Sequence, residues 1–110
     1  MAFSLLLSFP FPSLLLKSSN SARIVNVSSQ LGSLSIMTGY TLAYRLSKTA
    51  LNAMTRVWAS ELKDHGILVN SVCPGWVRTA LGGEDAPVSA IDGARSILEL
   101  ALISDDGPTG

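Results

Sequence analysis

The predicted fold depends on the stretch AYRLSKTALNAMTRVWASEL (residues 43–62), because its apolar side chains recur at the spacing of a helix. The apolar positions fall mostly at three- and four-residue steps and form one stripe: Tyr44, Leu51, Met54, Trp58 and Leu62. We expect a helix from Ala43 to His65 with most of this stripe in the core. Gly66 follows directly and is a typical residue for ending a helix.

The same helix places Tyr44 and Lys48 one turn apart on one face, since each residue rises about 1.5 Å along the axis. An ammonium beside a phenol favours the phenolate form, and such a phenol can act as a general acid or base. A tyrosine followed four residues later by a lysine also arises by chance, as a partly buried ring beside a solvated lysine. The neighbouring segments therefore decide whether the pair carries chemistry.

Two apolar runs flank the helix and predict buried strands. Residues 22–32, ARIVNVSSQLG, indicate a strand from Arg23 to Val27 that ends at paired serines and leads into a loop over residues 30–42. Residues 66–83, GILVNSVCPGWVRTALGG, indicate a second strand from Ile67 to Val72, broken by a Pro-Gly pair. The order of strand, helix and strand predicts a parallel α/β layer.

A last helix is expected from Ala90 to Ile103, because Ser89 can cap its first turn. Its apolar residues recur at helical spacing, and we expect five of them to point inward: Ile91, Ala94, Ile97, Leu98 and Ala101.

Three linked motifs now stand in a fixed order: RIVNVSS (23–29), AYRLSKTALNAMTR (43–56) and HGILVNSVCPGWVRT (65–79). Together they resemble the catalytic half of a short-chain dehydrogenase/reductase, and most of all the carbonyl-reductase-like members, over about residues 12–110. The resemblance implies an α/β fold, a partial Rossmann-like, doubly wound parallel sheet in a single partial domain. Residues 1–22 would be an altered helix remnant or a leader, and residues 23–110 the catalytic half.

The motif that binds nucleotide phosphates in such sheets is a glycine-rich loop after the first strand. Neither G-x-x-x-G-x-G nor G-x-G-x-x-G follows a strand pattern in this sequence. We therefore expect the amino-terminal nucleotide-binding half, and the strand that would follow Gly110, to be missing from this chain.

The resemblance assigns roles to individual residues. The catalytic set would be Ser29, Tyr44 and Lys48, with Ser28 as the alternative serine, because Ser29 stands slightly farther from Tyr44 than is usual in the family. The residues that contact the cofactor would be Tyr44, Lys48, Pro74, Gly75, Val77 and Thr79. Purely structural roles remain open, since the serines could satisfy backbone groups at a strand end and Pro-Gly could be an ordinary turn.

The implied activity is NAD(P)-dependent oxidoreduction of a small carbonyl or alcohol substrate, with Tyr44 as the acid/base. NADP is favoured over NAD by the resemblance, and no metal is expected. We expect this chain alone to be inactive or weakly active. Two alternatives stay open: a non-enzymatic remnant or interaction protein that forms a homodimer through the Tyr/Lys helix, and an isomerising relative such as a sugar-nucleotide epimerase.

Composition excludes several other classes. A formal net charge of zero and the lack of basic clusters argue against a nucleic-acid partner. Cys73 is the single cysteine, expected to be a buried residue at a strand end, so no intramolecular disulfide can form. The apolar run at residues 3–9 is shorter than the ~20 residues of a membrane span and lacks the basic start of an export signal. We expect a cytoplasmic protein, with export as the minor alternative.

Overall fold

A two-stranded parallel sheet lies at the centre of the computed structural model, which describes residues 10–110. Strand β1 is Arg23–Val27 and strand β2 is Leu68–Val72, and their register runs from Arg23 opposite Leu68 to Val27 opposite Val72. The first strand has the bounds predicted from the sequence, and the second begins one residue later than predicted. The expected α/β class with a partial parallel sheet is confirmed.

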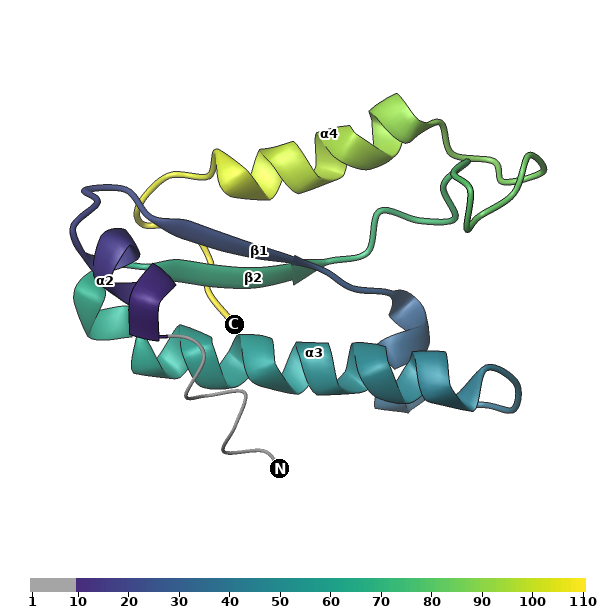
Figure 1. Ribbon diagram of the computed structural model, residues 1–110, viewed down its shortest axis with the longest axis horizontal. Helices are drawn as coiled ribbons and strands as arrows, with labels where there is room; N and C mark the ends of the chain where they lie inside the picture. The colour runs from purple at the N-terminus through teal and green to yellow at the C-terminus, as the bar shows by residue number, and fades with distance from the viewer. Residues whose placement is uncertain (1–9) are drawn as a thin grey trace.

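Two long helices cover opposite faces of this sheet (Figure 1). Helix α3, Leu42–Glu61, lies on one face, and helix α4, Ala90–Ala101, lies on the other. The remaining elements are the short helix α2 (Pro10–Lys17) and three single turns of 3₁₀ helix, η1 (Gln30–Gly32), η2 (Leu34–Ile36) and η3 (Lys63–His65). The helix predicted from Ala43 to His65 is therefore α3 followed by η3, and Gly66 ends it with a left-handed φ of 67°.

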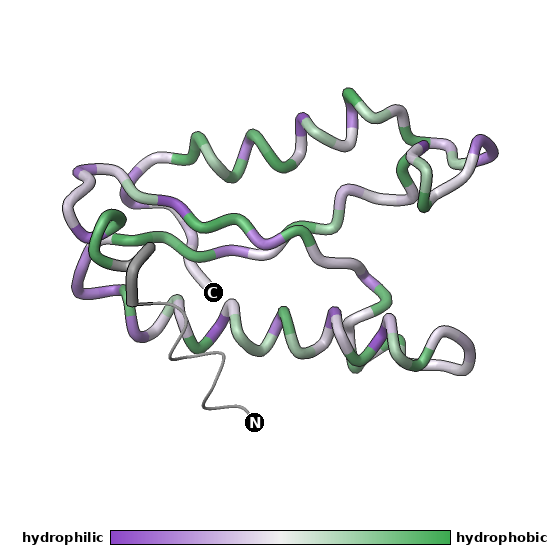
Figure 2. Tube along the Cα trace, viewed as in Figure 1, coloured by the Kyte–Doolittle hydropathy of each residue, from purple (hydrophilic) through white to green (hydrophobic). Residues whose placement is uncertain are grey.

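The core lies between the second half of α3 and the sheet. Trp58, Ala59 and Leu62 pack there against three buried residues at the starts of the strands, Ala22, Ile67 and Val69. Hydropathy along the chain follows this arrangement, since both strands are largely apolar (Figure 2). On β1, Ile24 packs against this cluster and the Asn26 amide donates to Thr55 Oγ1 of α3, so the even-numbered side chains face α3.

Helix α3 departs from the predicted apolar stripe. Two of its buried positions are polar, Arg45 and Thr55, whereas Tyr44, Leu51 and Met54 are only half-buried. Polar side chains of this helix are satisfied by hydrogen bonds, for example from Thr55 Oγ1 to Leu51 O at 2.8 Å and from Thr49 Oγ1 to Gly32 O at 3.0 Å. The helix face toward the serine loop is therefore a hydrogen-bonding surface, and only the other half is apolar core.

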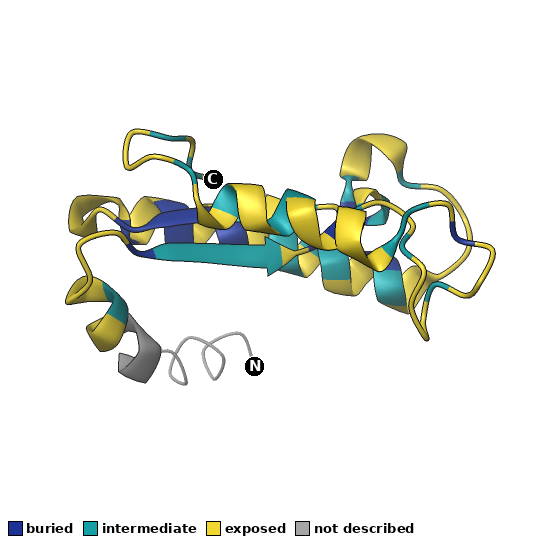
Figure 3. Ribbon diagram, turned by 90° about the horizontal axis from the view of Figure 1, so that it is seen from above, coloured by how far each residue is buried: buried dark blue, intermediate teal, exposed yellow. Residues whose placement is uncertain are grey.

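The prediction for the inward face of α4 is wrong. Ser89 caps the helix by accepting a hydrogen bond from the Asp92 amide, as expected. Of the five residues expected to point inward, however, only Ile97 is half-buried, and the others are exposed. Figure 3 shows that most of α4 is coloured as exposed. The helix rests instead on Gly93, where an added Cβ would lie 2.8 Å from a Val77 methyl group. A two-stranded sheet is too narrow to cover the rest of the apolar stripe.

Cys73 is exposed, because it lies just beyond the last residue of β2. The expectation that Cys73 is buried is therefore wrong.

The apolar run at residues 3–9 lies outside the described residues. Within residues 10–110, no helix has the length and apolar character needed to cross a membrane.

Candidate active site

The predicted site residues gather at one pocket, at the carboxyl ends of the two parallel strands. This open pocket has a volume of about 570 Å³. Its lining includes every residue to which the sequence assigned a catalytic or cofactor role: Ser28, Ser29, Tyr44, Lys48, Pro74, Gly75, Val77 and Thr79. Ligands of open α/β sheets bind at this edge, because the loops after neighbouring strands meet there. Their assembly is a finding, and their chemical roles stay predictions.

Lys48 connects α3 to the end of β1. Its ammonium lies 5.7 Å from the centroid of the Tyr44 ring and donates a 2.9 Å hydrogen bond to Val27 O. Among the described residues that line the pocket, it is the only charged side chain. The pocket is therefore positive beside the phenol, which suits an electron-rich ligand or a developing oxyanion.

The two serines have different environments. Ser28 is buried, and its hydroxyl donates to Asn52 Oδ1 at 2.6 Å. Ser29 is half-buried, and its Oγ accepts a hydrogen bond from the Leu31 amide at 3.1 Å. The hydroxyl proton of Ser29 has no acceptor within the described chain, so Ser29 retains a donor for a ligand oxygen while that of Ser28 is already engaged.

Asn52 is a residue of this region that the sequence analysis missed. It lies one turn after Lys48 on α3, accepts from Ser28 and directs its amide toward Gly32 O at 3.5 Å. The available signal was its position four residues after Lys48, which places it on the same helix face. Asn52 thereby links the strand end that carries the serines to the helix that carries Tyr44.

Arg45 holds the loop between the serines and Tyr44. It is buried, and its guanidinium donates to Tyr40 O at 3.0 Å, Thr38 Oγ1 at 3.3 Å and Leu31 O at 3.4 Å. Tyr40 and Thr41 both have left-handed φ values, 68° and 52°, which residues other than glycine rarely adopt. The Arg45 contacts offset this backbone strain and fix the wall of the pocket that Leu31 and Thr41 form.

The Pro-Gly segment forms the opposite wall. Gly75 has a φ of 85°, a conformation that glycine adopts without steric cost. Beyond it, the Trp76 indole donates to Gly82 O at 2.8 Å and Thr79 Oγ1 accepts from the Gly82 amide at 3.0 Å. These bonds close the segment into a compact turn, and Trp76 is a pocket-lining residue that is tied to its own loop.

No group of three or more histidine, cysteine, aspartate or glutamate side chains in residues 10–110 is placed to hold a metal ion. The polar groups that line the pocket include hydroxyls, an ammonium and backbone groups.

A family model described as enoyl-(acyl carrier protein) reductase matches residues 9–99. Among curated proteins, C-signal of Myxococcus xanthus is 40% identical over 79 residues, which are 71% of this chain and 48% of that protein. Carbonyl reductase [NADPH] 1 of Oryctolagus cuniculus is 42% identical over 74 residues, covering 62% of this chain and 27% of that protein. The chain thus spans less than half the length of each of these two relatives.

Solved structures of reductases also match this chain over less than half of their own length. Salutaridine reductase from Papaver somniferum superposes with a TM-score of 0.79 at 31% identity, over 87% of this chain and 46% of that one. The NADPH-bound carbonyl reductase from chicken fatty liver superposes with a TM-score of 0.67 at 35% identity, over 76% of this chain and 34% of that one.

Proposed function

The chain belongs to the short-chain dehydrogenase/reductase family, among its carbonyl-reductase-like members, and we propose that it supplies the proton-transfer half of an NAD(P)-dependent carbonyl reductase. One observation supports this proposal above all. The pocket that the Pro-Gly segment lines is also lined by Ser29, from the end of a strand, and by Tyr44 and Lys48, from helix α3.

The proposed roles follow from the contacts of each group. Tyr44 protonates the developing alkoxide during carbonyl reduction, or removes the hydroxyl proton in the reverse direction. Lys48, 5.7 Å from the ring centroid, stabilises the phenolate that forms. The Ser29 hydroxyl, whose proton has no acceptor in the described chain, donates to the substrate oxygen and polarises the carbonyl.

The nicotinamide cofactor supplies the hydride when it is bound. The residues present fit its nicotinamide end: Lys48 carries a donor cation at the pocket, and Gly75 leaves room for close approach of a flat ring to the backbone. Carbonyl reductases among the relatives carry NADPH in their names, so we propose NADP in preference to NAD. The glycine-rich phosphate loop has no counterpart in this sequence, so only part of the cofactor site is present.

Fluorescence titration of the purified chain with NADPH tests whether the chain alone holds only part of the cofactor site. We expect no binding or very weak binding, because the phosphates have no loop to hold them. Micromolar binding by the chain alone would contradict the claim that a second half is needed.

A second candidate function, association without catalysis, is favoured by a separate feature of α3. Its outer face exposes an apolar stripe: Leu42, Leu46, Ala50, Ala53 and Val57. One relative, moreover, bears the name C-signal rather than that of an enzyme. If this stripe forms a homodimer, size-exclusion chromatography with light scattering will show twice the mass of one chain, and Leu46→Glu will return it to a monomer. A monomeric wild-type chain would rule this candidate out.

A further inference from the structure

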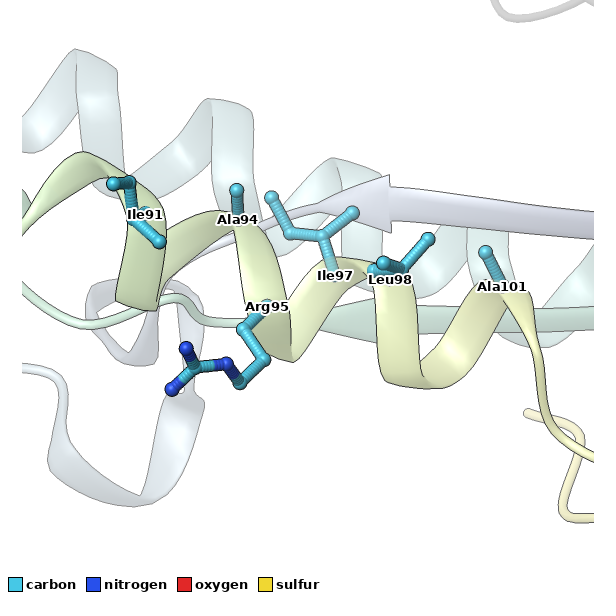
Figure 4. A pocket seen from close by; sticks show the side chains of 6 residues that line it. All are labelled: Ile91, Ala94, Arg95, Ile97, Leu98 and Ala101. Carbon is cyan, nitrogen blue, oxygen red and sulfur yellow. The ribbon is translucent and has the colours of Figure 1, made fainter.

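The proposed chemistry does not use the exposed apolar face of α4. Ile91 is 74% exposed and Leu98 is 55% exposed, on a helix that otherwise rests on the sheet. Together with Ala94, Ile97 and Ala101 they line an open groove of about 580 Å³ along the helix, and Figure 4 shows the Arg95 guanidinium extending away from these apolar side chains. An apolar stripe of this length is normally covered.

The outer edge of β1 is also open. The Leu68 amide donates to Ala22 O and the Ser28 amide donates to Val72 O, so the even-numbered backbone groups of β1 face β2. By the alternation of a parallel ladder, the backbone N–H and C=O of Arg23, Val25 and Val27 point to the other edge. No other segment of the described chain pairs with Val25 there, and the Lys48 ammonium donates a hydrogen bond to Val27 O.

The outer edge of β2 differs, because the chain covers it itself. The Gly110 amide donates to Val69 O at 2.9 Å, and the Val69 amide donates to Thr109 Oγ1 at 2.9 Å. The position for a further strand is therefore open at β1 and partly occupied at β2.

The open edge and the apolar groove belong to one surface. Ile24 and Asn26 face α3, so the side chains of Arg23, Val25 and Val27 face α4, and the Arg23 guanidinium indeed donates to Ile103 O just after α4. Val27 is 42% exposed at this side. A polypeptide that paired with β1 would meet the α4 stripe at the same time.

We propose that this surface, the β1 edge with the α4 stripe, binds the nucleotide-binding half of a reductase, and that it can do so when that half is supplied in trans. The occupant would add a parallel strand along Arg23–Val27, cover Ile91 and Leu98 with an apolar face, and bring a glycine-rich phosphate loop. This inference rests on the proposed function. It is supported by the lengths of the matched structures, since the chain covers 46% of salutaridine reductase and 42% of the Drosophila melanogaster carbonyl reductase Sniffer.

The geometry also predicts where the carboxyl end of the occupant's strand would lie. The carboxyl end of an added parallel strand would lie beside Val27 O, where the Lys48 ammonium is bound, at the edge that holds the candidate active site. Docking would therefore complete the cofactor site around Lys48 and Tyr44.

The test mixes this chain with a probe polypeptide, the part of rabbit carbonyl reductase [NADPH] 1 that precedes its matched segment, and repeats this with the corresponding part of (+)-neomenthol dehydrogenase from Capsicum annuum. Light scattering measures association, and NADPH fluorescence is measured separately. We expect a one-to-one complex with at least one probe and an NADPH affinity at least tenfold above that of either piece alone.

Leu98 and Leu46 provide matched variants, because both are 55% exposed and lie on opposite helices. Leu98→Glu should weaken the complex at least tenfold, and Leu46→Glu should leave it unchanged. Failure of both probes to associate, or a complex insensitive to Leu98→Glu, would overturn the docking proposal. A complex that is sensitive to Leu98→Glu but binds no NADPH would support the docking surface and contradict the proposed oxidoreductase function instead.

Discussion

The ammonium of Lys48 lies 5.7 Å from the centroid of the Tyr44 ring and donates a hydrogen bond to Val27 O, the carbonyl at the end of β1. One side chain thus joins the phenol on α3 to the sheet edge at which an added strand would end. The contact holds Lys48 at the pocket in the absence of a ligand. The ammonium has three donors, so it can keep Val27 O and still bind a ligand oxygen.

Replacing Tyr44 with phenylalanine should remove proton transfer and leave the fold intact. In the complex of this chain with a nucleotide-binding half, we expect Tyr44→Phe to lower the rate of reduction of a small aldehyde by roughly 10²–10⁴-fold, the usual range for a lost general acid. The absorbance of NADPH gives the rate. Tyr40→Phe is the matched control: residue Tyr40 is 93% exposed, so this variant should reduce the aldehyde at the wild-type rate. Equal rates for Tyr44→Phe and the wild type would contradict the assignment.

Substitution of Ser28 should mainly lower stability, and substitution of Ser29 should mainly lower activity. Ser28→Ala leaves Asn52 Oδ1 without its 2.6 Å donor, so we expect a loss of about 0.5–1.5 kcal/mol in the free energy of unfolding. Ser29→Ala should cost less stability, because Ser29 is half-exposed, yet it should lower the reduction rate more. Urea unfolding and the aldehyde assay measure the two effects. A larger activity loss in Ser28→Ala than in Ser29→Ala, at equal folded fraction, would make Ser28 the active serine.

The sequence predicted the elements well because their patterns are local. Both strands, the long helix with its glycine end and the Ser89 cap follow from apolar spacing and from residues that start or stop helices. The gathering of Ser29 and Pro74 was predictable because each follows the carboxyl end of a parallel strand, and these ends lie at one edge of the sheet.

What the sequence did not reveal depends on contacts across the fold. Asn52 and Arg45 read as ordinary polar helix positions, since nothing local shows that Ser28 and the loop oxygens lie opposite them. The α4 stripe read as core because helical spacing identifies an apolar face without showing what covers it. Only the width of the sheet, a property of the whole chain, decides that Ile91 and Leu98 are exposed.

Gly32 should be the least replaceable glycine near the site. A Cβ at this position would lie 2.7 Å from the Lys48 carbonyl carbon, a backbone atom of α3 that cannot move aside cheaply. We expect Gly32→Ala to destabilise the chain by about 1–3 kcal/mol through overpacking. Gly39→Ala is the control, because an added Cβ would meet nothing within 4 Å, and it should be neutral or slightly stabilising. Denaturant unfolding compares the two, and equal stabilities would show that α3 does not approach η1 this closely.

Arg45 should control the order of the loop that precedes α3. We expect Arg45→Met to increase amide hydrogen exchange at residues 38–41 at least tenfold, because three loop oxygens lose their donor. Arg45→Lys should fail to restore protection, since an ammonium lacks the planar fork that reaches all three oxygens. Exposed Arg56→Met serves as the control. Protection by Arg45→Lys equal to that of the wild type would show that charge alone holds the loop.

Asp105 should stabilise the chain above its titration range and lose that effect in acid. A hydrogen bond from Arg23, followed by one from Ser21, lowers the pKa of Asp105 below its ordinary value of 3.8. A lowered folded pKa means that the folded chain favours the carboxylate, so this stabilisation is complete above pH 3.8 and disappears as the pH falls through the lower, folded value. The Arg23 side chain is 8% exposed, while that of Asp105 is 71% exposed and screened by solvent, so the effect should be small and should shrink with added salt.

The thermal midpoint of Asp105→Asn, measured from about pH 2 to about pH 7 across the titration range of carboxylates, checks this prediction. The variant should unfold at a lower temperature than the wild type at neutral pH, and the two curves should converge in acid. Asp106, whose pKa is also lowered, mainly by its hydrogen bond with Ser104, is present in both proteins, so the difference mainly isolates Asp105. A difference that stays constant from neutral pH into acid would show that the ion pair with Arg23 does not tie the segment after α4 to the start of β1.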